Sequence, residues 1–194
     1  MKKPIGIKNY HKYYTQTAVQ KVMELFCKYP EKEFSLSDIA RLAGVAKTNL
    51  GEVLSGLEKI GFIQIEKLSK IWRIKANQKN WQFLRNKIIY NLNFVYQSGL
   101  VEFLYDLYNH PKSITLFGSF RKGEDISNSD IDIAVENDDF KEYKIRGLRE
   151  LFEFEKAISR KIQVHEFNRN KIDKGLFNNI ANGIVLMGFL EVRP

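Results

Sequence analysis

Paired cysteines, long apolar runs and internal repeats are all missing from this sequence of 194 residues. Its single cysteine, Cys27, can form no disulfide within the chain, and no group of cysteines and histidines has the spacing of a zinc site. No run approaches the ~20 apolar residues of a membrane span, and the basic N-terminus lacks the apolar segment of a signal peptide. We therefore expect a cytoplasmic protein with no membrane partner.

Acidic residues are outnumbered, because 31 lysines and arginines face 23 aspartates and glutamates and give a formal net charge of +8. An excess of positive charge favours polyanionic partners such as nucleic acids or nucleotides, although it says little about the fold. The length allows one ordinary domain or two small ones, each with its own core. We expect two domains, at residues 1–78 and 79–194.

The most informative stretch is Ser113–Glu136, in which two short β-patterned runs flank a loop rich in glycine and serine. The apolar run Ile114–Phe117 ends at Gly118-Ser119, where the chain can turn sharply and offer backbone N–H groups and a hydroxyl to an anion. The run Asp130–Glu136 alternates, so its apolar residues share one face of a strand and its two aspartates share the other.

These two aspartates, Asp130 and Asp132, repel each other unless a cation lies between them. Magnesium with a nucleoside triphosphate suits both halves of the stretch, because carboxylate oxygens hold the metal while the Gly-Ser turn holds the phosphates. The alternative is a plain β-hairpin, in which the Gly-Ser pair and the segment Ser-Asn-Ser-Asp are turn chemistry alone.

The motif Gly118-Ser119, followed after ten residues by Asp130-Ile131-Asp132, resembles the signature of the minimal nucleotidyltransferases, a branch of the DNA polymerase beta-like superfamily. The resemblance implies a short helix that begins at the Gly-Ser pair and grips the terminal phosphates of ATP or another nucleoside triphosphate. It also implies that both aspartates are catalytic and bind Mg²⁺ or Mn²⁺. The candidate nucleotide-binding residues are then Gly118, Ser119, Arg121, Lys122 and Ser129.

In that family a later strand, here Lys161–Phe167, carries a third acid that helps to deprotonate the attacking hydroxyl. The sequence departs from this pattern, because Gln163 stands where we expect the acid, with His165 on the same face and Glu166 on the opposite one. Glutamine can orient a hydroxyl but cannot accept its proton. Three interpretations stay open: a shifted register makes Glu166 the third acid, His165 is the base, or the site binds nucleotide without efficient transfer.

The N-terminal part predicts a helix-turn-helix. Apolar spacing indicates a helix over Thr15–Cys27, a short helix capped by Ser37 and a second helix over Lys47–Ile60. Two alternating runs follow, Phe62–Glu66 and Ile71–Lys75, and they resemble the wing of a winged helix-turn-helix domain.

In winged domains the second helix enters the major groove of DNA, and the wing touches backbone phosphates or the minor groove. The candidate DNA-binding residues are Lys47, Thr48 and Asn49 in the helix and Lys67, Lys70 and Arg73 in the wing. The alternative is a dimerisation or docking module. Winged-helix proteins often bind DNA as dimers, which leaves a homodimer open.

The remaining segments predict an α/β domain. We expect a leading helix at 81–110 that is broken near Ser98-Gly99, a catalytic core at 113–167 and a C-terminal closure at 168–194. Within the core, apolar spacing predicts a charged helix from Tyr143 to Ile158. The expected fold class is α+β, with an N-terminal winged helix-turn-helix and a nucleotidyltransferase-like domain that has a small mixed or antiparallel sheet.

The function that the resemblance implies is transfer of a nucleoside monophosphate, AMP first among them, from a nucleoside triphosphate to a hydroxyl. Minimal members of the family are often antitoxins that modify a partner toxin protein encoded beside them, so we expect a protein acceptor. The competing hypothesis is a DNA-binding transcriptional regulator whose nucleotidyltransferase-like domain senses nucleotide or a partner without catalysis.

Overall fold

The computed structural model describes residues 17–68 and 71–192. These residues form two compact units that divide between Tyr90 and Asn91, inside a helix. Sequence reasoning placed the division between residues 78 and 79, ahead of that helix.

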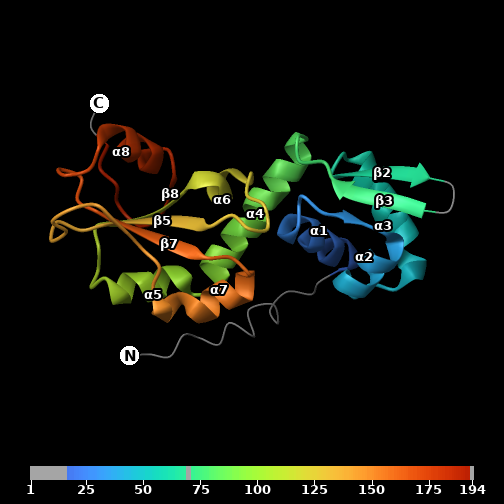
Figure 1. Ribbon diagram of the computed structural model, residues 1–194, viewed down its shortest axis with the longest axis horizontal. Helices are drawn as coiled ribbons and strands as arrows, with labels where there is room; N and C mark the ends of the chain where they lie inside the picture. The colour runs from blue at the N-terminus through green and yellow to red at the C-terminus, as the bar shows by residue number, and fades with distance from the viewer. Residues whose placement is uncertain (1–16, 69–70, 193–194) are drawn as a thin grey trace. The chain divides into compact units, whose positions relative to one another are not determined.

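The N-terminal unit combines helices with a small antiparallel sheet (Figure 1). Its elements are α1 (Ala18–Lys28), β1 (Glu33–Phe34), α2 (Leu36–Ala43), α3 (Lys47–Lys59), β2 (Ile63–Leu68), β3 (Ile71–Ala76) and the first part of α4 (Trp81–Gln97). The strands lie in the order β1-β3-β2. The expected pair of helices and the hairpin are confirmed, whereas the short strand β1 was not anticipated. Part of the expected turn between the hairpin strands lies outside the described residues.

Helix α2 shows how local chemistry sets an element boundary. Ser35 caps it, since the Ser35 hydroxyl accepts the Asp38 N–H at 3.2 Å and the Asp38 carboxylate accepts the Ser35 N–H at 3.3 Å. The expected cap, Ser37, is therefore wrong. Only Ser35 stands three residues before an acid, Asp38, whose carboxylate can accept the N–H of the capping residue. The Ser35 hydroxyl, with Arg41 beside it, lowers the pKa of Asp38. Gly44 ends the helix in a left-handed conformation.

The core of this unit is apolar and draws on every helix and strand named above. Cys27 is buried in it. The other fully or nearly fully buried members are Val22, Phe26, Ile39, Leu50, Leu54, Leu57, Phe62, Ile63, Ile74 and Phe83.

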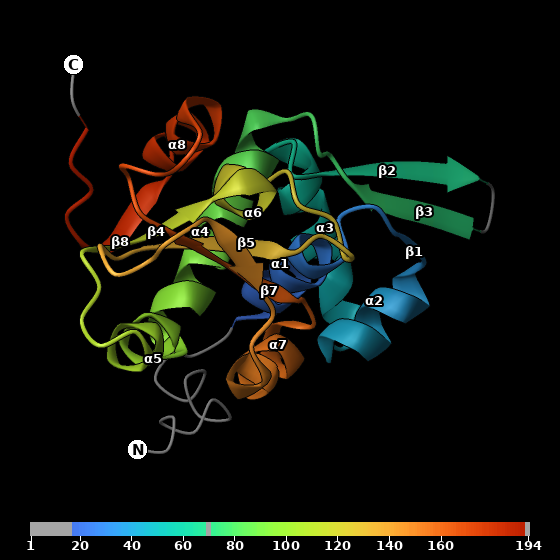
Figure 2. The same cartoon turned by 60° about the vertical axis from the view of Figure 1, so that its left-hand side comes forward.

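The C-terminal unit is built around a five-stranded sheet in the order β6-β7-β5-β4-β8. After the rest of α4, its elements are α5 (Leu100–Leu107), β4 (Ser113–Phe117), α6 (Gly118–Lys122), β5 (Ile131–Glu136), β6 (Lys144–Arg146), the 3-10 turn η2 (Arg149–Leu151), α7 (Phe152–Ile158), β7 (Ile162–Phe167), α8 (Lys174–Ala181) and β8 (Ile184–Gly188). Strands β5 and β7 run parallel and the other neighbours antiparallel, which confirms a mixed sheet. Helices α5 and α7 lie on one side of the sheet, and α6 and α8 lie on the other (Figures 1 and 2).

The predicted helix from Tyr143 to Ile158 is wrong in its first half. That part forms β6 and η2, and only Phe152–Ile158 is α-helical. Lys144 and Arg146 of β6 pair with Glu166 and Val164 of β7. The ladder along the edge of β7 satisfies the backbone of this segment and outweighs its helical spacing. The expected break in the leading helix is confirmed at Gly99, which has a φ of +77°.

Strand register positions the site. Asp132 lies opposite Phe117 on β4 and opposite Gln163 on β7. Two residues further on, Ala134 packs with Phe117 and with Ile180 of α8, so Asp132 and Ala134 belong to the face that α8 covers. Within the described residues, no helix has the length and apolar character needed to cross a membrane.

Candidate functional site

The two aspartates lie where β5 begins, and both are partly exposed. The carboxylate of Asp132 sits against Gly118, the first residue of α6. Gly118 has a φ of +73°, and a Cβ placed there would overlap the Asp132 carboxylate. Any other residue would therefore be strained and would displace the acid. The Gly-Ser turn and the aspartate pair, which are separate in sequence, form one constellation.

Beside α6 is a cleft of about 450 Å³, here called the α6 cleft. Its lining residues are Phe117, Gly118, Ser119, Arg121, Lys122, Glu124, Asn179 and Asn182. Neither Arg121 nor Lys122 makes an ion pair with any residue in the described part of the chain. The cleft therefore offers two unpaired cations beside a backbone turn, which is a suitable environment for a polyphosphate.

Sequence reasoning missed the two asparagines that α8 and its C-terminal end bring to this cleft. Asn182 donates a hydrogen bond to the Asn178 carbonyl at 2.8 Å, which leaves its side-chain oxygen available to a ligand. The segment Asn-Asn-Ile-Ala-Asn-Gly predicted only the end of a helix, and nothing in that pattern points to a cleft formed with α6.

Ser129 is not brought to the α6 cleft. Its hydroxyl accepts the Ile126 N–H at 3.0 Å and closes the turn that precedes Asp130. It lines a different cleft, together with Asp130 and Phe152.

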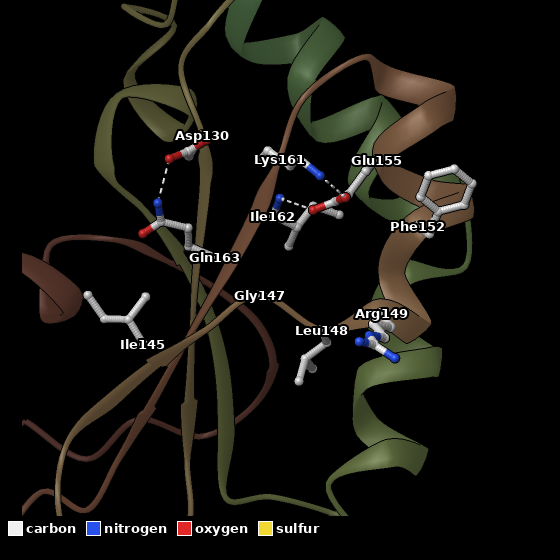
Figure 3. A pocket seen from close by; sticks show the side chains of 10 residues that line it. All are labelled: Asp130, Ile145, Gly147, Leu148, Arg149, Phe152, Glu155, Lys161, Ile162 and Gln163. Atoms are coloured by element: carbon white, nitrogen blue, oxygen red, sulfur yellow. Dashed lines mark hydrogen bonds and ion pairs between the residues drawn. The ribbon is translucent and has the colours of Figure 1, made fainter.

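The amide of Gln163 occupies the position where the third acid was expected. It neighbours Asp132 across the parallel ladder, and its Nε2 donates a short hydrogen bond to Asp130 (Figure 3). This contact orients the Asp130 carboxylate, but a primary amide has no proton-accepting role at neutral pH.

His165 is buried, with 6% of its surface exposed, and both ring nitrogens are engaged. Nε2 lies 3.2 Å from Asp132 Oδ1, and Nδ1 lies 2.5 Å from the Tyr143 hydroxyl. Because a carboxylate only accepts, Nε2 carries a proton and donates to Asp132, while Nδ1 accepts from Tyr143. Burial, helped by the charge of Asp132, raises the pKa of Tyr143. The arrangement suits orientation of Asp132 rather than uptake of a substrate proton.

Glu166 points away from the aspartate pair. Tyr108 donates to its Oε1 at 2.9 Å, and Arg146 Nε donates to its Oε2 at 2.8 Å. Burial, with the Glu166 hydrogen bond second, raises the pKa of Tyr108 above the ordinary range, and the Glu166 hydrogen bond raises the pKa of Arg146. The structure therefore separates Glu166 from Asp130 and Asp132.

A buried ion pair supports the loop that delivers Asp130. Arg160 lies 3.1 Å from Asp125, and their side chains are 3% and 0% exposed. Asn91 donates to Asp125 at 2.8 Å, and Arg160 also donates to the Ser127 carbonyl at 2.8 Å. This network fixes the chain between α6 and β5.

Two carboxylates without a third acid still fit a magnesium ion. The described residues contain no group of three or more histidine, cysteine, aspartate or glutamate side chains arranged to hold a metal. Magnesium, however, commonly takes only one or two carboxylates and completes its shell with substrate phosphates and water. The room that Gly118 leaves for Asp132 places such oxygens next to the α6 cleft.

The candidate DNA-binding residues of the N-terminal unit are on its surface. Lys47, Thr48 and Asn49 are exposed at the start of α3, which has no side-chain cap. Arg73 is exposed on β3, and the Lys67 ammonium lies 4.5 Å from the Trp72 ring centroid. Lys70 lies outside the described residues.

The α6 cleft, the aspartate pair and strands β4 to β7 all lie within residues 98–185. Residues 98–185 match the family model of the nucleotidyltransferase domain. This match supports the resemblance to the nucleotidyltransferase superfamily that the motif predicted. No curated protein and no solved structure matched the chain. A match to this domain model supports nucleotidyl transfer in general, with a nucleoside triphosphate as substrate.

Proposed function

We propose that this protein transfers a nucleoside monophosphate, most simply AMP, from a nucleoside triphosphate to a hydroxyl group, with Mg²⁺ as cofactor. The observation that supports this most strongly is the contact between Gly118 and Asp132. It joins a carboxylate pair to a cleft with two unpaired cations. A triphosphate in that cleft would present its α-phosphorus to the carboxylate pair.

Each residue has a defined role in this proposal. Gly118, Ser119, Arg121 and Lys122 bind the β- and γ-phosphates. Asp130 and Asp132 hold the metal, and Gln163 and His165 orient their carboxylates. The bound metal supplies charge neutralisation at the α-phosphate and the leaving group. Most of the rate enhancement then comes from positioning and electrostatics.

The proposed transfer is an in-line displacement at the α-phosphorus. An oxygen lone pair of the acceptor hydroxyl forms a bond to the α-phosphorus, and the bond from that phosphorus to the bridging oxygen breaks. Its electron pair leaves with pyrophosphate, and the hydroxyl proton passes to water. Glu166 is remote from the site and both nitrogens of His165 are engaged, so we assign neither residue as a base.

The acceptor that we propose is a partner protein, as in antitoxin-type members of the superfamily, and this part rests on analogy. For the N-terminal unit we propose a winged helix-turn-helix that binds DNA. Helices α2 and α3, the hairpin β2–β3 and the exposed residues Lys47, Thr48 and Asn49 support this role.

Residue 163 is a glutamine where an acid was expected, and this favours a second candidate function. In it, the protein is a DNA-binding regulator whose nucleotidyltransferase-like domain senses nucleotide without turnover. A salt-dependent shift of DNA mobility that is unaffected by Asp130→Ala, together with nucleotide binding but no transfer, would support this alternative.

Transfer can be tested by incubating the protein with Mg²⁺ and α-labelled ATP, GTP, CTP or UTP, with and without the protein encoded by the adjacent gene. Pyrophosphate release and label on protein are measured together. We expect both from the wild type and neither from Asp130→Asn/Asp132→Asn, while Asp139→Asn, in an exposed loop, behaves as the wild type. Nucleotide binding without pyrophosphate release or label would overturn the transfer proposal.

A further inference from the structure

Asp130 also lines a cleft of about 760 Å³ that shares no lining residue with the α6 cleft (Figure 3). We call it the β6 groove and define it by Asp130, Ile145, Leu148, Arg149, Phe152 and Gln163. Strand β6, turn η2, helix α7 and strand β7 supply its walls. Asp130 lines this groove and not the α6 cleft, whereas Gly118 and Ser119 line the α6 cleft and not this groove.

The position of the groove indicates the side from which the acceptor approaches the nucleotide. The attacking and leaving oxygens of a phosphoryl transfer lie roughly in line on opposite sides of the phosphorus. Pyrophosphate leaves on the side of the cations in the α6 cleft, so the hydroxyl has to approach from the side of Asp130. Resting on the function proposed above, we infer that the β6 groove binds a segment of a partner protein whose hydroxyl side chain accepts the nucleotide.

The apolar character of the groove fits a protein segment. Ile145 is 53% exposed and Phe152 is 57% exposed, and Leu148 lies between them in sequence. A groove with large exposed apolar side chains on opposite sides, as Figure 3 shows here, is typical of a site of protein interaction. They offer an apolar side chain of the acceptor segment a place to be buried next to the reacting hydroxyl.

The charges argue against a nucleic acid in the groove and specify the peptide further. Lys161 is neutralised by Glu155 at 3.0 Å, and the other oxygen of Glu155 accepts the Ile162 N–H at 3.0 Å. Arg149 is the cation of the groove that makes no ion pair within the described residues. One free guanidinium cannot make the many phosphate contacts on which nucleic-acid binding depends, but it can pair with one acidic side chain.

In Figure 3 Arg149 and Asp130 lie at opposite ends of the groove. The segment therefore combines a hydroxyl at the Asp130 end, an acidic residue at the Arg149 end and at least one apolar residue.

The test uses the full chain, Mg²⁺ and α-labelled ATP, with three sets of acceptors. These are degenerate peptide libraries centred on tyrosine, serine or threonine, a single-stranded RNA oligonucleotide with a free 3′-hydroxyl, and small polyhydroxy compounds. We expect label on peptides, with preference for apolar and acidic residues on one side of the hydroxyl. Phe152→Ala lowers labelling about tenfold, and Arg149→Glu changes the preference from acidic to basic residues. Phe189→Ala and Lys141→Glu, which alter exposed side chains outside the groove, are matched controls with wild-type labelling.

The outcomes separate this inference from the proposed function. Label on RNA or on small compounds but not on peptides overturns the peptide acceptor and leaves nucleotidyl transfer intact. Peptide labelling that is unchanged in Phe152→Ala and Arg149→Glu overturns the groove. Pyrophosphate release that depends on Asp130 and Asp132, without label on any acceptor, also overturns the inference, whereas absence of pyrophosphate release overturns the proposed function itself.

Discussion

The two units of this chain differ in what they bury. The described part of the N-terminal unit has an apolar core, and Lys87 is its one buried charged or polar residue. The C-terminal unit buries many polar side chains beneath its sheet and at its edges, namely Asn91, Ser98, Ser113, Thr115, Asp125, Glu136, Arg160, His165, Glu166 and Asn168. Buried polar groups cost free energy unless they are hydrogen-bonded, so their concentration in one unit marks where side-chain orientation matters.

Several of these buried groups form hydrogen-bonded networks. Glu136 accepts Arg169 through both oxygens, at 2.6 and 3.1 Å, and also the Ser113 hydroxyl at 3.1 Å. Asp125 likewise accepts a hydrogen bond from Arg160, and Asp132 accepts one from His165. The C-terminal unit therefore holds several of its acids in fixed directions, whereas the described part of the N-terminal unit is held together by apolar packing.

The largest effect is expected from Arg160→Met, which leaves Asp125 charged and buried. The free energy of unfolding of the C-terminal unit should fall by about 3–5 kcal/mol, as measured by amide hydrogen exchange in β4, β5 and β7. Both tryptophans, Trp72 and Trp81, belong to the N-terminal unit, so the urea transition followed by tryptophan fluorescence should stay in place. Arg149→Met is the matched control, and equal destabilisation by both variants would contradict the role of the ion pair.

Leu54→Ala is the corresponding change in the apolar core. Leu54 is fully buried in α3, so we expect a loss of about 3 kcal/mol from the transferred methyl groups and the cavity that remains. Tryptophan fluorescence should report this loss, while hydrogen exchange in β5 stays unchanged. Leu42→Ala, at a side chain that is 48% exposed, should have little effect. Loss of protection in both units would mean that their cores are not independent.

Tyr143→Phe is expected to weaken metal binding without unfolding the protein. It removes the hydroxyl that holds His165 Nδ1, so the donor to Asp132 is no longer fixed. The dissociation constant for Mn²⁺, measured by proton relaxation with a non-hydrolysable ATP analogue, should rise about tenfold. Tyr105→Phe serves as the control, because the Tyr105 hydroxyl makes no hydrogen bond in the described part of the chain. An unchanged Mn²⁺ constant in Tyr143→Phe would show that the chain through His165 does not orient Asp132.

The smallest effect concerns alkaline pH. Burial raises the pKa of Tyr108 and of Tyr143 in the folded protein, so their neutral forms are favoured there. Their contribution to stability is complete below the ordinary tyrosine pKa of about 10 and is lost as pH rises through the folded values. The urea midpoint of the C-terminal unit should therefore fall above about pH 10 in the wild type and fall less in Tyr108→Phe. A parallel decline in both proteins would exclude Tyr108 as the cause.

Local patterns predicted much of this fold. Strict alternation placed β5 with Asp132 in it and Asp130 directly before it. The Gly-Ser pair marked the start of α6, and Gly99 marked the break between α4 and α5. The helix predicted over Tyr143–Arg146 was wrong. The apolar spacing there is helical, but residues 144–146 pair with the edge of β7 as a strand. Sequence reasoning also failed to find Asn179, Asn182 and Tyr143 at the site, because no local pattern reports which distant segment a helix end or a loop will face.

The sequence by itself determined the motif, its spacing and its faces, since these depend on chain geometry over a few residues. Only the tertiary structure decided which of Gln163, His165 and Glu166 lie beside the two aspartates. The parallel register of β5 with β7 brings Gln163 and His165 to the aspartates and turns Glu166 toward Tyr108 and Arg146. Adjacent residues of a strand point to opposite faces, but which face meets the partner strand's acids depends on pairing between segments far apart in the chain.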